Sequence, residues 1–513
     1  MHLQIKIILI IGLLGLASCI HRTKNEEGPY YEKSVAFPPG LSQEEKIKMA
    51  ARVVPDSQQL AWQKLEMTAF IHFTINTFTG LEWGEGDESP ELFMPSEFDA
   101  SQWARIISEA GMKMIILTCK HHDGFCLWPT KTTDHSVKYS RWRGGKGDVV
   151  REVKEACDEY GLKFGIYLSP WDRNAKSYGD SPEYNSFFME QLKELLTWYG
   201  KVDEVWFDGA CGEGPNGKVQ VYNWDAYYRL IERYQPGAVT AIMGEDIRWV
   251  GTESGYGRET EWSVTALAPG GSPESKNINE NLGLQATSPD LGSEKIIEKA
   301  NKAFWYPAEV DVSIRPGWFY HSEENDKVKS LDELFDIYIN SVGRNAVLLL
   351  NIPPDTRGLI HENDAIRLKE LKAYLDMTFR ENIAFRAFTR YPGARKSVDG
   401  KEDTYTYIDE FPAEIEYKFP FAREFNLFMI KENIAKGQRI EEFSIEAFVN
   451  EEWIELESST TVGYKKLLTF PNTTSDRIKL TIKQSRDKAM ITETGLFLTP
   501  DSINADGEKV RLK

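Results

Sequence analysis

Residues 101–125 read SQWARIISEAGMKMIILTCKHHDGF and contain one complete structural unit of this chain. The amphipathic segment 101–110 predicts a helix, and Gly111 follows it at the point where a helix commonly ends in the left-handed conformation. The apolar run 114–117 predicts a short buried strand. The polar residues His121 and His122 come directly after that strand, so the unit is a helix, a glycine stop and a strand with polar side chains beyond its end.

The same unit recurs further along the chain. The predicted helices 150–160 and 187–199 also stop at a glycine, and a strand follows each of them within a few residues. Helices that alternate with apolar strands are typical of a parallel sheet with covering helices, and eight such units fit a closed (β/α)8-like TIM barrel better than an open doubly wound sheet. The predicted strands are 68–71, 114–117, 164–168, 204–207, 239–243, 247–250, 310–314 and 347–350.

The barrel pattern is uneven near its end. The sixth unit is weak, and residues 266–292 form a long insertion rich in Gly, Pro, Ser and Asn. Ser330 and Glu333 have the spacing of a capping box, which predicts the start of the last helix before strand 347–350. We therefore expect the catalytic barrel to occupy residues 41–377.

The pattern changes after residue 378. Helical periodicity ends, and segments of alternating polarity such as 413–419, 442–449 and 477–482 are separated by turn-rich stretches. This pattern predicts a C-terminal antiparallel β-sandwich domain over residues 378–513.

The N-terminus has the features of a targeting segment. A short basic start precedes an apolar run that is too short to span a bilayer as a permanent helix, which is typical of a signal peptide. Leu16-Ala17-Ser18-Cys19 resembles a bacterial lipobox, so we expect a lipoprotein signal peptide over 1–18, lipidation of Cys19 and a tether over 19–40. The predicted protein is secreted and anchored to the bacterial outer membrane, periplasmic or on the cell surface, with membrane contact only through the lipid. An ordinary secretory signal with an incidental cysteine is the alternative.

Composition excludes some classes of function. A formal net charge of -18 without a basic stripe argues against nucleic acid as a partner. The 41% hydrophobic and 27% charged residues are ordinary for a globular protein. After Cys19 only four cysteines remain, too few for a disulfide framework in a domain with a large core, so we expect free thiols.

In a parallel barrel the catalytic groups lie just beyond the carboxyl ends of the strands. Here these ends carry His72, His121 with His122, Tyr167 and Asp208. Asp208 stands between the aromatic pair of 206–207 and a glycine, where a sugar can approach the backbone closely. Such a position suits a nucleophile.

Glycosidic cleavage needs a second carboxyl group to protonate the leaving oxygen. The candidates after the fourth strand are Glu245, Asp246, Glu253, Glu259 and Glu261. Glu253 lies in a loop of small residues that leaves its side chain free to face a cleft. Glu259 and Glu261 flank Arg258 and are alternatively structural ion-pair partners.

Five segments in register carry a family resemblance. The segments 70–73 (FIHF), 120–125 (KHHDGF), 165–169 (GIYLS), 206–209 (WFDG) and 315–319 (RPGWF) resemble the α-L-fucosidases of glycoside hydrolase family 29. The resemblance covers nearly all of the chain beyond the signal. It implies a retaining exo-glycosidase with Asp208 as nucleophile, and a shell that binds fucose, consisting of His72, Glu82, His121, His122, Tyr167 and Trp318.

The stretch 249–264 looks like the branch of that family that acts on α-1,3/4-linked fucose. In that branch the acid/base is a glutamate, which here falls on Glu253. The implied substrate is a fucosylated oligosaccharide or glycoconjugate, and no cofactor is expected. On this interpretation Arg258, Glu259, Glu261 and Trp262 hold a neighbouring sugar branch.

Three other interpretations compete with this one. Another retaining exo-glycosidase on the same barrel, such as an α-galactosidase, differs in whether the pocket binds a hydroxymethyl group. A non-catalytic surface lipoprotein that binds glycans would not need two carboxylates. A zinc site at His121 and His122 is disfavoured, because adjacent histidines in an extended segment point to opposite sides and no tetrahedral ligand spacing recurs.

Overall fold

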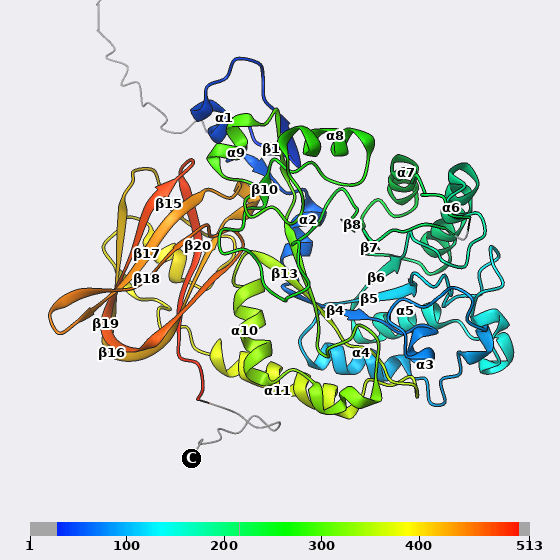
Figure 1. Ribbon diagram of the computed structural model, residues 1–513. Coiled ribbons are helices and arrows are strands. Elements are labelled where there is room, and N and C mark those ends of the chain that lie inside the picture. The colour runs from blue at the N-terminus through cyan, green and yellow to red at the C-terminus, as the bar shows by residue number, and fades with distance from the viewer. Residues whose placement is uncertain (1–27, 215, 502–513) are drawn as a thin grey trace, which may run out of the picture.

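The computed structural model describes residues 28–214 and 216–501, and its centre is an eight-stranded parallel sheet closed into a barrel (Figure 1). The strand order is β8-β7-β6-β5-β4-β13-β12-β9, and a parallel bridge between Ala241 and Ile247 joins the two ends. All eight predicted strands are present, so the predicted barrel is confirmed. The strands are β4 (Met67–Ile71), β5 (Met114–Lys120), β6 (Lys163–Leu168), β7 (Glu204–Phe207), β8 (Val239–Ile242), β9 (Arg248–Trp249), β12 (Ala308–Ser313) and β13 (Ala346–Asn351).

Helices cover the outside of the barrel, and their ends follow the predicted signals. Gly111 and Gly161 have positive φ angles of 84° and 69° at the ends of their helices, as the glycine stops predict. Ser330 forms the predicted capping box with Glu333. The covering helices are α4 (Ala100–Glu109), α5 (Val149–Tyr160), α6 (Ser181–Trp198), α7 (Trp224–Tyr234), α10 (Leu331–Ser341) and α11 (Glu362–Thr378), with the short α3 (Asn76–Thr79) after β4.

The weak sixth unit has a structural reason. β8 leads into the two-residue β9 without a helix in the described residues between them. The chain then leaves the barrel and forms β10 (Val264–Thr265), α8 (Pro273–Leu282), α9 (Glu294–Lys299) and β11 (Lys302–Trp305). The insertion is therefore folded, and its apolar side chains form a separate small core that includes Leu267 and Trp305.

The predicted tether extends too far into the globular part. Within it, β1 (Tyr31–Glu32) pairs with β3 (Val53–Val54), and β2 (Ser34–Ala36) pairs with β11. Val35 and Phe37 are buried in the small core with helix α1 (Gln43–Ala50), so this part of the chain is held by apolar contacts. Helix α2 (Ser57–Gln63) then leads into β4. The predicted signal peptide and Cys19 lie outside the described residues and stay predictions.

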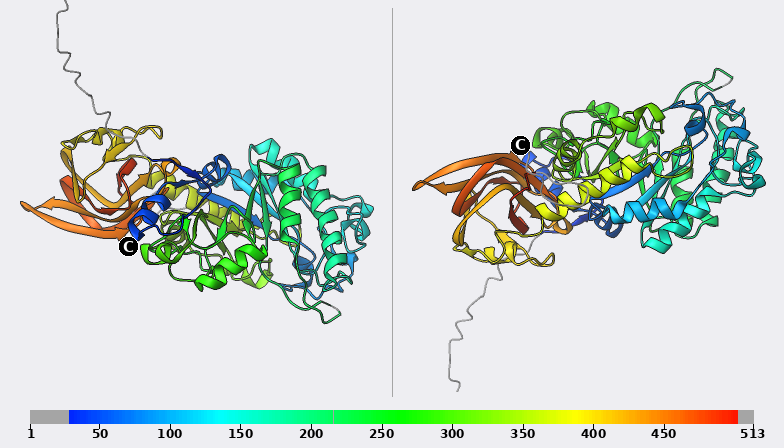
Figure 2. Two further views of the ribbon diagram at one scale, coloured as in Figure 1. Left: turned by 90° about the horizontal axis from the view of Figure 1, so that it is seen from above. Right: turned by 90° about the horizontal axis from the view of Figure 1, so that it is seen from below.

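Helix α11 ends at Thr378, and the strands after it form the predicted antiparallel sandwich beside the barrel (Figure 2). The two longest strands, β16 and β19, pair with each other along most of their length and link both layers around one apolar core. The strands are β14 (Phe388–Thr389), β15 (Thr406–Ile408), β16 (Ala413–Glu432), β17 (Ile440–Val449), β18 (Glu452–Thr460), β19 (Lys466–Ser485) and β20 (Ala489–Phe497).

Two further observations concern the whole described chain. The cysteines Cys119, Cys126, Cys157 and Cys211 are free, as expected. Across residues 28–214 and 216–501, none of the helices combines the length and the apolar character that a membrane span requires.

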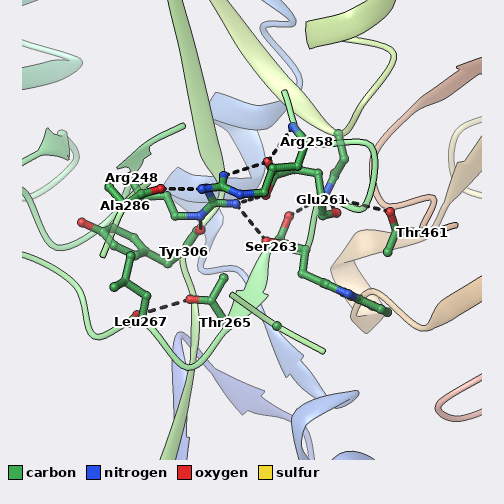
Figure 3. A network of polar contacts seen from close by, with 12 residues as sticks. Arg248, Arg258, Glu261, Ser263, Thr265, Leu267, Ala286, Tyr306 and Thr461 are labelled. Atoms are coloured by element: carbon green, nitrogen blue, oxygen red, sulfur yellow. Dashed lines mark hydrogen bonds and ion pairs between the residues drawn. The ribbon is translucent and has the colours of Figure 1, made fainter. Parts of the chain in front are cut away.

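A buried ionic cluster joins the barrel to the sandwich (Figure 3). The carboxylate of Glu261 is paired with the guanidinium groups of Arg248 and Arg258, and Glu261 is only 1% exposed. Its backbone N–H donates to Thr461 Oγ1 in the sandwich at 3.1 Å, and its carbonyl accepts from Gln438 Nε2 at 2.9 Å. One glutamate therefore neutralises the buried guanidinium of Arg248 and the partly buried guanidinium of Arg258, and it fixes the junction.

We expect Glu261→Gln to lower the free energy of unfolding by about 3–5 kcal/mol, because it leaves buried guanidinium charges without a counter-charge. Chemical denaturation measures this change. Glu259→Gln is the matched control, since Glu259 is exposed two residues away, and it should change stability by less than about 0.5 kcal/mol. Equal effects of the two substitutions would contradict the assignment.

Candidate active site

A small pocket lies at the carboxyl ends of the barrel strands, where parallel barrels place their active sites. Its volume is about 100 Å³. Seven of the eight catalytic and substrate-binding residues predicted from the sequence line it, and Glu82 does not. The lining residues are Phe70, His72, Trp83, His121, His122, Tyr167, Trp206, Asp208, Ala210, Glu253, Asp311 and Trp318.

Strand alternation explains why these side chains meet. Side chains two residues apart on a strand face the same side, so His72 continues the inward face of Phe70 and Asp208 continues that of Trp206. Phe70 and Trp206 both belong to the apolar core inside the barrel. The pocket is therefore the polar end of the column of side chains that fills the barrel.

Asp208 is fixed by two hydrogen bonds. Tyr167 Oη donates to its Oδ2 at 2.9 Å, and the Ala210 backbone N–H donates to its Oδ1 at 2.7 Å. The side chain is 23% exposed, and His122 Nε2 lies 3.8 Å from Oδ2. One carboxylate is thus held rigidly and still faces the pocket.

The three histidines are neutral at neutral pH. Burial lowers the pKa of His72 to about 3, and burial also lowers the pKa of His121 and His122. His72 Nδ1 is 2.8 Å from Asn351 Oδ1, and His122 Nδ1 is 2.7 Å from Ser169 Oγ. The rings therefore offer hydrogen bonds to a sugar rather than positive charge.

The prediction that His121 and His122 point to opposite sides is wrong. Their ring centroids are 4.1 Å apart, and both rings line the pocket. The reason is that β5 ends at Lys120 and the chain turns there, with the Gly124 N–H donating to the His121 carbonyl. Within the described part of the chain, no group of three or more His, Cys, Asp or Glu residues is arranged to hold a metal ion.

Glu253 lies in the exposed loop after β9, and the Trp318 indole N–H donates to its Oε2 at 3.3 Å. Glu82 does not line the pocket and instead binds the backbone of the segment that carries this indole. Its carboxylate accepts the Trp318 backbone N–H at 2.9 Å and contacts His321 Nε2 at 2.7 Å. A Cβ atom at Gly317 would come within 2.6 Å of Glu82 Oε1, so the glycine of the RPGWF segment makes this contact possible. Glu82 positions Trp318, which in turn holds Glu253.

Five residues of the pocket are not among the site residues expected from the sequence: Phe70, Trp83, Trp206, Ala210 and Asp311. Asp311 is the most informative of these, because it adds a third carboxyl group. It is 4% exposed, accepts the Trp249 indole N–H at 2.8 Å, and burial raises its pKa to about 7. The alternation of polar and apolar residues along 308–313 is the sequence signal that would have identified Asp311 as an inward-facing residue.

The loop after Glu253 corrects a second expectation. Glu261 and Trp262 are buried at 1% and 3% exposure, and Arg258 is held by Glu261 and by the backbone carbonyl of Ser288. Arg258, Glu261 and Trp262 therefore do not hold a neighbouring sugar branch, whereas Glu259 is exposed and that part of the expectation stays a prediction. The alternative interpretation of Glu261 as a structural ion-pair partner is confirmed.

A barrel with carboxyl groups and aromatic rings around a strand-end pocket defines the class of this protein as glycoside hydrolase. The family described as "Alpha-L-fucosidase" matches residues 50–378. The chain belongs to the α-L-fucosidase family, and the predicted resemblance to glycoside hydrolase family 29 is confirmed.

Individual relatives agree with the family match. The chain is 41% identical to "Alpha-L-fucosidase 1" of Arabidopsis thaliana over 461 residues, which cover 87% of each protein. It is similar to a crystal structure from Bacteroides ovatus with 54% identity and a TM-score of 0.87, covering 95% of this chain and 80% of that one. It also resembles a family 29 fucosidase from Ruminococcus gnavus solved with fucose, with 30% identity, a TM-score of 0.77 and coverage of 93% and 98%.

Proposed function

We propose that this α-L-fucosidase is a retaining exo-enzyme in which Asp208 is the nucleophile and Glu253 is the acid/base. The observation that carries the proposal is the pocket itself, in which these two carboxyl groups stand on strand-end segments of β7 and β9. Its volume of about 100 Å³ suits a single terminal sugar, which supports exo action.

In the first step Asp208 Oδ attacks the anomeric carbon of fucose, and the bond from that carbon to the glycosidic oxygen breaks. The proton for the leaving oxygen comes from Glu253. Trp318 binds only one oxygen of Glu253, so the other oxygen is available to carry this proton. The products are a fucosyl ester of Asp208 and the released alcohol.

In the second step Glu253 takes a proton from water as the water oxygen attacks the same carbon, and Asp208 leaves as a carboxylate. The hydrogen bonds from Tyr167 and Ala210 stabilise that carboxylate each time it re-forms. The neutral histidines His72, His121 and His122 supply donors and acceptors for the sugar hydroxyls without adding a charge that would compete with Asp208.

Fucose fits this pocket better than galactose does. Fucose has a methyl group where galactose has a hydroxymethyl group, and Phe70, Trp206 and Trp318 give the pocket apolar ring surface. A hydroxymethyl group packed on such rings would lose its hydrogen bonds to water. A purely glycan-binding role is disfavoured because three carboxyl groups face one small cavity.

We further propose a preference for α-1,3/4-linked fucose on a branched N-acetylglucosamine. Its support is the resemblance of residues 249–264 to that branch of the family, together with Trp83, which lines the pocket and is 54% exposed. The exposed part of this indole is available to stack on the sugar that bears the fucose.

The nucleophile assignment predicts that Asp208→Asn lowers turnover of an aryl α-L-fucoside at least about a thousandfold while the fold stays intact. Asp208→Gly with added azide should yield a β-fucosyl azide, because azide attacks from the vacated face. Product analysis by NMR checks both this outcome and retention in the wild type. Asp225→Asn, an exposed aspartate on α7, is the matched control, and normal activity of Asp208→Asn would refute the assignment.

The acid/base assignment predicts a dependence on the leaving group. Glu253→Gln should lower cleavage of a natural fucosyl-oligosaccharide by about 10²–10⁴-fold, because its alcohol needs protonation. Formation of the fucosyl-enzyme from an activated aryl fucoside should be spared. Pre-steady-state measurements with the two substrates test this, with Asp225→Asn as the control. Equal losses on both substrates would remove Glu253 as the acid.

The linkage proposal predicts faster fucose release from α-1,3/4-linked branched oligosaccharides than from α-1,2-linked ones, and Trp83→Ala should reduce this difference by weakening the contact with the neighbouring sugar. A panel of defined fucosylated oligosaccharides with separated products measures both rates. Faster release from the α-1,2-linked substrates would overturn the preference without affecting Asp208.

A further inference from the structure

Two of the pocket histidines are held by a hydrogen bond at one ring nitrogen only. His72 Nδ1 is 2.8 Å from Asn351 Oδ1, and His122 Nδ1 is 2.7 Å from Ser169 Oγ. Nε2 of these two rings is not among the fully buried, unpartnered atoms of residues 28–214 and 216–501, whereas Nδ1 of His121 is. Nε2 is therefore the atom that each of the two rings offers to a sugar in the pocket.

The contact with Ser169 decides which nitrogen of His122 carries the hydrogen. Ser169 Oγ donates its one hydrogen to the backbone carbonyl of Trp171 at 2.7 Å, and a carbonyl oxygen only accepts. The serine therefore has only lone pairs left for His122, so Nδ1 must supply the hydrogen of their contact. Because a neutral imidazole has a single ring N–H, His122 Nε2 carries none.

A second chain of hydrogen bonds decides the same question for His72. Asn351 Nδ2 donates to the carbonyl of Trp318 at 2.8 Å and to Ser313 Oγ at 2.9 Å, and Ser313 passes its own hydrogen to the carbonyl of Gly317 at 2.7 Å. The opposite orientation of the amide would place its oxygen against the carbonyl oxygen of Trp318. Asn351 Oδ1 therefore accepts from His72 Nδ1, and His72 Nε2 is left without a hydrogen.

We propose that Ser169 and Asn351 fix His122 and His72 as Nδ1–H tautomers, so that both rings present a bare Nε2 and recognise the sugar by hydrogens that its hydroxyl groups donate. Both residues are positioning residues, because they act through the histidines. Burial lowers the pKa of both rings, which keeps a second proton off Nε2. The inference rests on the proposed function, since it concerns how the same pocket recognises its sugar.

The bare nitrogens also affect the proposed nucleophile. His122 Nε2 lies 3.8 Å from Asp208 Oδ2. A ring N–H at this place would draw on the negative charge of the carboxylate, whereas a bare nitrogen leaves Asp208 with the hydrogen bonds from Tyr167 and Ala210. A sugar hydroxyl that donates to Nε2 is therefore bound beside the reacting oxygen without a competing donor from the ring.

The first test reads the tautomers directly by NMR of the full chain, isotope-labelled at the histidine ring nitrogens. Protonated and bare ring nitrogens differ widely in chemical shift. At neutral pH and without sugar, His72 and His122 should each show a protonated Nδ1 and a bare Nε2, with signals assigned from their loss in His72→Gln and His122→Gln. A protonated Nε2 on either ring would overturn the proposal. This measurement does not depend on activity.

The second test separates positioning from a purely structural role. Ser169→Ala removes the acceptor for His122 Nδ1–H, so a protonated Nε2 should become detectable by NMR, and kcat/KM on an aryl fucoside should fall about tenfold. Ser140→Ala is the matched control, because Ser140 is also buried and donates to a backbone carbonyl, that of Val137, at 2.7 Å. It should change neither the tautomers nor kcat/KM. An unchanged His122 tautomer in Ser169→Ala would remove the positioning role.

The third test uses analogues of L-fucose in which one ring hydroxyl is replaced by hydrogen or by fluorine. Fluorine is close to a hydroxyl in size but cannot donate a hydrogen. At two of the three hydroxyl positions, both analogues should bind at least about tenfold more weakly than fucose, and the fluoro analogue should bind no better than the deoxy analogue. Calorimetry or inhibition constants measure these affinities.

Fluoro analogues that bind better than their deoxy counterparts at two or three positions would require ring N–H donors and would overturn the proposal. A wild type that neither binds fucose nor releases it from fucosides would instead count against the proposed function. The NMR measurement without sugar would then still decide the tautomers.

Discussion

The inside of the barrel depends on one repeated interaction, in which a tryptophan indole N–H donates to a carboxyl group. Trp62 binds Glu204, Trp206 binds Glu309, Trp249 binds Asp311 and Trp318 binds Glu253, from the barrel interior to the pocket mouth. Buried carboxyl groups are costly unless they are hydrogen-bonded, and an indole supplies a donor together with a large apolar surface that fills the core. The same four rings therefore pack the barrel and fix its acids.

This arrangement sets the electrostatics of the pocket. Because the donors to the acids are neutral indoles, a tyrosine hydroxyl and backbone N–H groups, the carboxyl groups do not require nearby cations. Burial keeps the histidines neutral for the same reason that it keeps a proton on the deeper acids. The result is a pocket in which negative charge is concentrated on a few defined oxygens.

The ion pairs that stabilise the surroundings of the pocket lie elsewhere in the molecule than these indole–carboxyl hydrogen bonds. Two buried ion pairs outside the barrel interior hold segments that shape the pocket. Arg315, at the end of β12, is fully buried and pairs with Asp364 on α11 at 2.9 Å, which fixes the start of the segment that presents Trp318. Glu261 fixes the end of the loop that begins with Glu253, and it does so against the sandwich. The C-terminal domain thus braces the barrel through a loop that also carries a proposed catalytic residue.

The sequence by itself determined the elements and the strand ends. Local signals such as apolar runs, glycine stops and the Ser330 capping box depend on neighbouring residues only, so all eight strands and the polar residues that follow them were predictable, as was Asp208. Only the tertiary structure decided which side chains share a cavity, because this depends on the strand order and on side-chain direction around a closed barrel. It brought Asp311 and Trp83 into the pocket and placed Glu82 outside it, at the backbone of Trp318. It also showed that Glu261 and Trp262 are buried, although their segment looks exposed in sequence. Residues 31–32 and 34–36 are strands because their pairing partners lie at Val53–Val54 and Lys302–Trp305, far along the chain.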